Sequence, residues 1–343
     1  MPTPTRVSIA DVAREAGVSL GTVSNVLNHP DVVAAATRRW VLDVIDELGF
    51  MPNSAARQLR SGNALAVGVI VMDLRNPFYT EVAYGIGDRL DQADYALLIS
   101  SSGNDPARES RQLKAFSAHG VAGVIIVPTR HGDQATLRAL VDDGTTVVLL
   151  ESPVPGLDLP CVKSDNVFGG RLAGDHLLGL GATSLVMFNG PHSIRQCRQR
   201  AHGARDAIRA AGLDPDTAFH EVIVPSLDAA GGDAAAQQWL AKHGGKTPAA
   251  LFCVNDLVAI GAQRAFRSFS DYNPTNCRIV GYDDIDYATE LVTPLTSIRQ
   301  PTYQMGYHAA ELLLDGGNAD TEPTLLPELV VRASTVGVVN GGG

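Results

Sequence analysis

From residue 63 onward, short apolar runs rich in β-branched residues alternate with Ala-rich stretches of helical length. The runs cover residues 65–72, 96–99, 121–127, 146–150, 185–188, 249–254 and 278–280. Strands that alternate with helices are typical of βαβ units, which predicts an α/β fold with doubly wound parallel sheets. A loop with Pro and Gly at 152–160 interrupts the alternation near the middle, which favours two similar subdomains over one very wide sheet.

Length and composition exclude several classes of protein. The chain has 343 residues, of which 45% are hydrophobic and 19% charged, as in an ordinary globular protein of two or three domains. Its apolar runs are too short to cross a membrane, and residues 1–8 lack the apolar segment of a secretory signal, so we expect a cytoplasmic protein without a membrane partner. The four cysteines lack the spacing of a metal or redox site, and we expect buried thiols at Cys161, Cys197, Cys253 and Cys277.

The charge is unevenly distributed along the chain. The formal net charge is −10, yet residues 1–62 hold six Lys or Arg and six Asp or Glu, so the whole excess lies beyond residue 62. An acidic body argues against non-specific binding of nucleic acid. The neutral N-terminal segment is therefore the only candidate for contact with DNA.

Residues 1–50 have apolar residues at helical spacing only, and their first part predicts two helices joined by a tight turn. Ser8 and Asp11 form a capping box, Gly17 supplies the turn, and Ser19 caps the second helix. This pattern is that of a helix-turn-helix, although an ordinary αα-hairpin inside a helical bundle fits it too.

Residues 52–62 predict a helix of about two turns, because Pro52 ends the preceding helix, Asn53 or Ser54 caps the next, and Gly62 ends it. Isolated helices this short are marginal in water. We therefore expect this segment to need a partner in order to fold.

Motifs spread over nearly the whole chain resemble those of the LacI/GalR family of bacterial transcription regulators. Each motif alone is weak evidence, and it is their order along the chain that makes the resemblance specific. The motifs lie at residues 9–19, 22–24, 26–28, 37–38, 48–50, 52–53, 59–62, 76–79, 190–191, 200 with 203, 255–256, 281–284 and 294–300.

The resemblance implies a small all-α helix-turn-helix domain at 1–51 and a hinge helix with linker at 52–62. Residues 63–343 would form two subdomains like those of periplasmic binding proteins, which bind an effector and dimerise. It further implies a repressor of carbohydrate-utilisation genes that binds double-stranded, palindromic operator DNA as a homodimer and is released by a small effector, most simply a sugar. No tetramer-forming heptad follows Val336, so the expectation stops at a dimer.

The family's DNA-contacting positions carry over to the second helix and the hinge. Asn25 suits adenine, whereas Gly21 has no side chain with which to contact a base. Leu59 occupies the position that wedges into the minor groove, with packing against the sheet domain as the alternative. The full set is Ser19, Leu20, Gly21, Thr22, Ser24, Asn25, Asn53, Ala56, Arg57, Leu59 and Arg60.

Polar residues recur where predicted strands end, and ligands of open α/β sheets bind at those ends. In the resemblance, Phe78 stacks on the effector and Arg200 bonds its polar groups. Alternatives remain open: Asp256 as a helix cap, Asp283 as a turn residue, and Arg200 in a surface ion pair. The implied effector-binding set is Asn76, Phe78, Asp165, Arg200, Asn255, Asp256, Asp283 and Gln300, and its excess of carboxylates favours a neutral polyhydroxyl ligand.

No catalytic or metal-binding motif survives inspection. The segment Gly245-Lys246-Thr247 ends like a phosphate-binding loop but lacks the first Gly, since Leu240 stands there, and the nine His are scattered. We therefore expect a regulator without cofactor, metal or catalytic residues. The alternative is a cytoplasmic sugar-binding or sugar-processing protein whose helical N-terminus binds other proteins.

Overall fold

The computed structural model describes residues 7–50, 66–129, 133–268, 273, 276–317 and 324–336. These residues form two compact units, one on each side of the boundary between Ala64 and Leu65. The predicted hinge at 52–62 lies outside the described residues.

The first unit is helical, with a core at the centre of its helices. Val12, Val23, Val41 and Val44 are buried there, one or two from each long helix. The elements are α1 (Ile9–Ala16), α2 (Leu20–Asn28), the short η1 (Pro30–Val32) and α3 (Ala35–Leu48).

The predicted caps of this unit are present. Ser8 and Asp11 form a reciprocal capping box, and hydrogen bonds from Ser8 and Arg14 lower the pKa of Asp11 to about 2. Gly17 has a φ of +67°, and the Ser19 hydroxyl accepts the backbone N–H of Thr22 at 3.0 Å. The N-cap of α3, Ala34, provides no side-chain hydrogen bond, as its residue type predicts.

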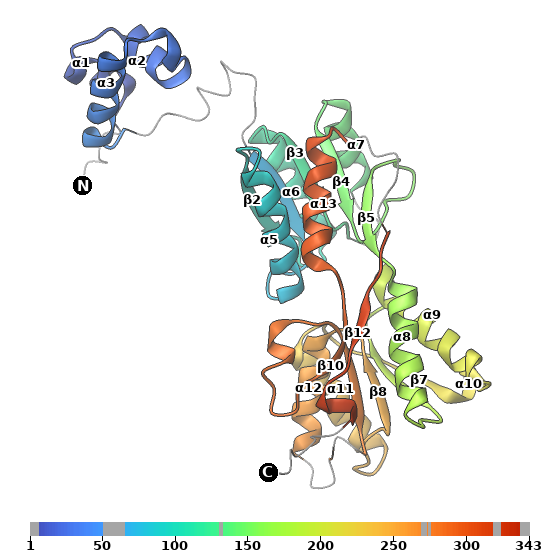
Figure 1. Cartoon of the computed structure of the whole chain (residues 1–343). Coiled ribbons are helices and arrows are strands. Elements are labelled where there is room, and N and C mark those ends of the chain that lie inside the picture. Colours follow the sequence, from blue (N-terminus) through green and yellow to red (C-terminus); the bar gives the residue numbers. More distant parts are fainter. Residues whose placement is uncertain are drawn as a thin grey trace. The chain divides into compact units, whose positions relative to one another are not determined.

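The second unit contains two six-stranded sheets, which confirms the prediction of two parallel-sheet subdomains (Figure 1). Strand order in the first sheet is β11-β5-β4-β3-β1-β2, and all its pairs are parallel. Its strands are β1 (Ala66–Val71), β2 (Ala96–Ser101), β3 (Gly123–Ile126), β4 (Thr146–Leu150), β5 (Cys161–Ser164) and β11 (Thr324–Leu325).

The second sheet has the order β12-β10-β9-β8-β6-β7, and only the β10–β12 pair is antiparallel. The composition pattern missed β7, in which exposed His220 and half-buried Glu221 break the apolar run. Its strands are β6 (Leu185–Asn189), β7 (Phe219–Ile223), β8 (Ala250–Cys253), β9 (Arg278–Asp283), β10 (Thr296–Arg299) and β12 (Glu328–Val330).

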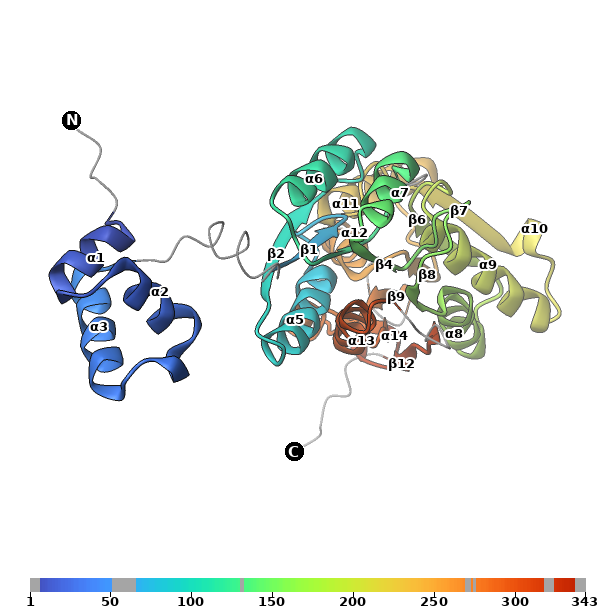
Figure 2. The same ribbon diagram turned by 90° about the horizontal axis from the view of Figure 1, so that it is seen from above.

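Helices cover both faces of the first sheet. Figure 2 shows α5 (Pro77–Asp91) and α13 (Thr302–Leu314) on one face, with α6 (Pro106–Ala118) and α7 (Gln134–Asp142) on the other. Two separate apolar clusters fill these interfaces. The helices of the second half are α8 (Asn166–Gly179), α9 (Arg195–Ala210), α10 (Pro215–Ala218), α11 (Ala229–Lys242), α12 (Asp256–Arg267), η2 (Asp286–Ala288) and α14 (Ala333–Val336).

The chain returns to the first subdomain after building most of the second. Helix α13 follows β10 of the second sheet but packs on α5, and β11 then joins the first sheet before β12 joins the second. The two subdomains are thus joined by several crossings of the chain. The loop at 152–160, which suggested the division, instead connects β4 to β5 inside the first sheet.

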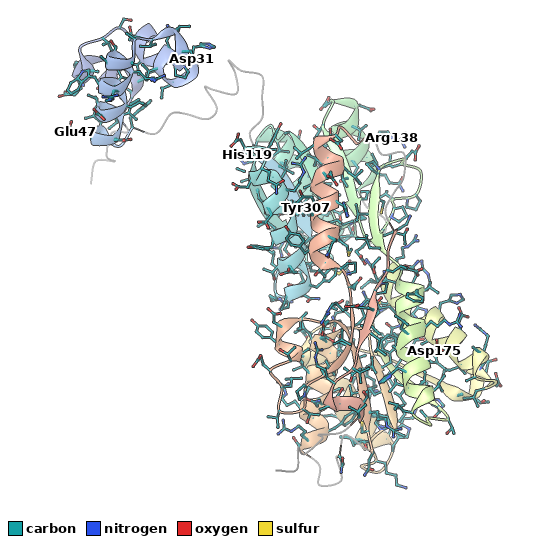
Figure 3. The ribbon with its side chains drawn as sticks, in the orientation of Figure 1. Asp31, Glu47, His119, Arg138, Asp175 and Tyr307 are labelled. Atoms are coloured by element: carbon teal, nitrogen blue, oxygen red, sulfur yellow. The ribbon has the colours of Figure 1, made fainter. Side chains whose placement is uncertain are left out.

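Helices α5 and α13 approach each other closely at glycines. A Cβ on Gly85 would lie 2.1 Å from the carbonyl oxygen of Tyr303, and one on Gly306 would lie 1.9 Å from that of Val82. Figure 3 labels Tyr307 on α13. Its hydroxyl donates to Gln92 Oε1 at 3.1 Å, just beyond the end of α5. All four cysteines are buried and none forms a disulfide, and no helix of the described residues is long and apolar enough to span a membrane.

We expect Gly85→Ala to lower the free energy of unfolding by about 1–3 kcal/mol, because the added methyl has no space against the backbone of α13. Gly87→Ala, on the same helix, is the matched control: its Cβ would come no closer than 3.8 Å to Leu97. Chemical denaturation of the full chain checks this prediction. Equal stability of the two variants would show that α5 and α13 separate without cost.

Candidate functional site

The start of α2 is exposed on the surface of the helix-turn-helix. The side chain of Leu20 is 53% exposed, and Gly21 and Asn25 are also exposed, whereas Val23 and Val26 are buried in the helical core. Trp40 Nε1 on α3 donates to the carbonyl oxygen of Ala16 at 3.0 Å, which fixes α3 against the end of α1.

Of the predicted DNA-contacting residues, Ser19, Leu20, Gly21 and Asn25 are exposed, and Thr22 and Ser24 are half-buried. One exposed surface at a helix N-terminus suits insertion into a major groove, where the first turn approaches base edges. The predicted hinge contacts lie outside the described residues: Asn53, Ala56, Arg57, Leu59 and Arg60.

A cavity of about 540 Å³, here called the cleft cavity, lies between the carboxyl ends of the two sheets. From the first sheet it is lined by the loop after β1 and by Glu151 after β4. From the second it is lined by the start of α9 and the loops after β7, β8 and β9. Six of the eight predicted effector-binding residues line it: Asn76, Phe78, Arg200, Asn255, Asp283 and Gln300.

Arg200 is a buried cation of the cleft cavity, with 6% of its surface exposed. Its Nε donates to Asn166 Oδ1 at 2.8 Å and its Nη1 to the carbonyl oxygen of Val254 at 2.6 Å. Its guanidinium lies 3.6 Å from the ring centroid of Tyr282. The alternative of a surface ion pair is therefore wrong.

Asp283 lies next to Arg200, with its Oδ1 3.8 Å from Arg200 Nη2 and 2.9 Å from the donating Nε2 of Gln300. Its φ of +101° is a strained conformation for a residue with a side chain. Burial raises the pKa of Asp283, while Arg200, Gln300 and Asn76 oppose the rise.

Glu151 is a cavity residue that the sequence analysis missed. It is 3% exposed with a φ of +66°, and its Oε1 has no hydrogen-bond partner among the described residues. Burial raises the pKa of Glu151, although the charge of Arg200 opposes this. A signal was available, because Glu151 directly follows the predicted strand at 146–150, as the chosen residues follow theirs.

Asn76 and Asn255 have a second, structural role as helix N-caps. The Oδ1 of Asn76 accepts from Phe78 N at 3.0 Å, and that of Asn255 accepts from Val258 N at 2.8 Å. Phe78, 6% exposed, is fixed edge-on against Tyr79 with ring centroids 4.9 Å apart. The cavity wall is thus held by the first turns of α5 and α12.

Two predicted residues do not line the cleft cavity, which corrects the sequence-based set. Asp165 caps α8 by accepting the backbone N–H of Phe168 at 2.9 Å. Asp256 is fully buried, and its carboxylate accepts from Ser297 Oγ at 2.6 Å and Ile285 N at 2.9 Å. It therefore holds β10 and the loop after β9 together rather than facing a ligand. The alternative role of Asp256 as N-cap of α12 is wrong, because Asn255 is that N-cap.

The cleft cavity is also lined by charged residues that the sequence-based set omitted. Arg75 donates its Nη2 to Asp73 at 2.7 Å, and Asp228 caps α11 while lying on the opposite subdomain. Asp228 follows β7, the strand that the sequence pattern missed. Among the described residues, no group of three or more His, Cys, Asp or Glu is placed to hold a metal ion.

We expect Glu151→Gln to raise the melting temperature of the effector-free protein at neutral pH. Because the folded-state pKa of Glu151 is raised, the stability it contributes is full below the ordinary Glu pKa and is lost as pH rises toward the folded value. The gain of the variant should therefore shrink toward acid pH. Melting curves from pH 5 to 8, with exposed Glu290→Gln as control, check it; a gain independent of pH would contradict this.

Comparisons with known proteins cover both units. Residues 8–53 match the family described as bacterial regulatory proteins, lacI family. Residues 64–327 match the family described as periplasmic binding proteins and sugar binding domain of LacI family.

Among curated relatives, the transcriptional regulator DegA of Bacillus subtilis is 31% identical over 96% of this chain and 98% of its own length. The ribose operon repressor of Escherichia coli is 30% identical over 93% and 94%. The solved lac repressor dimer, bound to operator and the anti-inducer ONPF, has a TM-score of 0.81 and 27% identity over 96% of this chain and 99% of its own. These proteins are a transcriptional regulator and two repressors.

Proposed function

The chain belongs to the LacI family of bacterial transcriptional regulators, and we propose that it is a cytoplasmic repressor that a sugar releases from its operator. In this proposal a homodimer binds a palindromic operator through α2 of each protomer. The sugar binds in the cleft cavity. Family membership shows that the chain is a transcriptional regulator. We propose in addition that it is a cytoplasmic dimer, that it binds a palindromic operator and that its ligand is a sugar.

The observation that carries the DNA-binding part is the exposed surface of Leu20, Gly21 and Asn25 at the capped start of α2. An amide side chain there bonds the N6 and N7 atoms of adenine in the major groove, while Gly21 adds no base contact. Twofold symmetry of a dimer requires half-sites about one helical turn apart. The named relatives add support, since one is a ribose operon repressor and one solved neighbour is bound to operator.

The sugar part rests on the polar groups that face the cleft cavity. Buried Arg200 is a hydrogen-bond donor, and the Oε1 atoms of Glu151 and Gln300, which have no partner among the described residues, are acceptors. This combination suits the hydroxyl groups of a sugar, because a hydroxyl group both donates and accepts. Phe78 supplies an apolar surface for a sugar face. Two buried carboxylates against one buried guanidinium disfavour a phosphate in this cavity.

In this proposal, sugar binding in the cleft cavity and operator binding through α2 affect each other. A sugar that closes the cleft and lowers operator affinity must itself bind the operator-bound protein more weakly by the same factor. The link through Asn53 to Arg60, including a wedge by Leu59, remains a prediction.

We expect Asn25→Ala to relax base preference at one position per half-site, with a cost of about 1–3 kcal/mol at that base. Operator variants titrated at fixed salt measure it. Glu47→Gln, an exposed change on α3, serves as control. An unchanged base profile after Asn25→Ala would show that this residue does not recognise sequence.

We expect Arg200→Gln to weaken sugar binding roughly tenfold to a hundredfold, because charge-assisted hydrogen bonds contribute about 1.5–3 kcal/mol each. The sugar comes from a thermal-shift screen, and calorimetry then gives its Kd. Arg209→Gln is the matched control, since Arg209 lies on the same helix and pairs with Asp206 at the surface. Operator binding without sugar should survive in both variants. Unchanged sugar affinity in Arg200→Gln would place the ligand elsewhere.

A further inference from the structure

A second cavity of about 590 Å³, here called the side cavity, adjoins the cleft cavity. The two share four lining residues: Met72, Asn104, Ile194 and Gln196. Each alone falls within the roughly 300–1,000 Å³ of ordinary small-molecule sites. Because the two adjoin, they provide room for a ligand of two linked units.

The ionisable residues that line the side cavity are basic. They are His192, Arg195 and Arg198, and no carboxylate belongs to its described lining. Arg198 Nη1 donates to the carbonyl oxygen of His192 at 2.7 Å, and His192 Nε2 lies 2.7 Å from Glu221, which is a nearby acid. The cleft cavity, by contrast, has Glu151 and Asp283 around Arg200. The charge therefore changes sign along the joined space.

The start of α9 adds hydrogen-bond donors to the side cavity. Helix α9 begins at Arg195, and Ile194 at its N-cap offers no side-chain acceptor to the free backbone N–H groups of the first turn. Thr129, on the opposite subdomain, is 5% exposed, and its hydroxyl lies against the carboxylate of Glu109. A helix start and two Arg side chains suit an anionic group.

We propose that the effector is a disaccharide whose unit in the side cavity carries a negative charge, as a carboxylate or a phosphate. This inference rests on the proposed sugar-binding function and names its ligand class. The neutral unit lies in the cleft cavity against Phe78 and Arg200, and the charged unit lies beside the Arg195–Arg198 turn. The apolar surface of Pro153 and Val154 lies beside the second ring.

Another cavity beside the cleft cavity has mainly acidic lining residues and therefore favours a ligand of the opposite charge. This third cavity, which shares Phe78, Asp283 and Gln300 with the cleft cavity, is lined by the acids Glu81, Asp284, Asp286 and Glu328 and by one cation, Arg299. Asp284 is already bonded to Arg299 and Arg332. A disaccharide with an amine on its second unit would prefer this third cavity, so the sign of the ligand charge distinguishes the two.

The experiment measures Kd for matched pairs of sugars by calorimetry with the full chain. The pairs are maltose with maltose 6-phosphate and galactobiose with digalacturonate, and galactose, galacturonate and an amino disaccharide complete the panel. We expect an acidic disaccharide to bind more tightly than its neutral partner, with an advantage that declines as salt rises. Which pair shows the advantage tells a phosphate from a carboxylate.

Variants then locate the charged unit. We expect Arg195→Gln and Arg198→Gln each to reduce the acidic-over-neutral preference about threefold to tenfold, a modest effect because both side chains are accessible to water. Arg209→Gln, farther along α9, should leave the preference unchanged. Operator binding by each variant verifies that it is folded.

Each other result overturns the proposal in a distinguishable way. Equal affinity for neutral and acidic partners, or a preference that survives both Arg variants, rejects the anionic unit. Binding of galacturonate as tight as that of digalacturonate rejects the second unit, and a preference for the amine places it in the third cavity. If no sugar binds at all, the proposed sugar-responsive function itself fails.

Discussion

The buried guanidinium of Arg200 is the charge on which the arrangement of the cleft depends. Removed from water, it needs acceptors on every side, and it finds them on α8, at the end of β8 and at the end of β9. Tyr282 supplies the surface on which it stacks. The same demand explains why Glu151 and Asp283 tolerate burial and strained backbone beside it. A single cation thus fixes both the walls of the cavity and its polarity.

Side chains with two roles give the cleft its rigidity. Asn76, Asn255 and Asp228 each cap a helix and also line the cavity, so the first turns of α5, α12 and α11 hold these side chains in place. Motion is then expected between the subdomains rather than within them, because the several crossings of the chain act as hinges while each sheet stays intact. A ligand that contacts both subdomains favours the closed arrangement by its differential affinity alone.

Much of the site was predictable from one rule, that polar residues after parallel strands gather at one edge. The rule found Asn76, Asn255 and Asp283, and applied fully it would have found Glu151. Arg200 lies inside α9 and was predicted from the family resemblance alone. It failed for Asp165 and Asp256, because a carboxylate after a strand is equally suited to capping a helix or bonding a neighbouring loop. Only the direction of each side chain separates these roles, and sequence spacing does not specify it.

The sequence by itself determined the capped helices of the N-terminal unit, the alternation of strands and helices, and the family, since these depend on local hydrogen bonding and periodicity. The tertiary structure decided that α13 packs on α5, through glycines at which two backbones touch. It also decided that Asp256 bonds β10 and the loop after β9, and that two cavities adjoin beside Gln196. Such features arise where residues far apart in the chain share one space, because packing and burial are properties of contacts rather than of residue order.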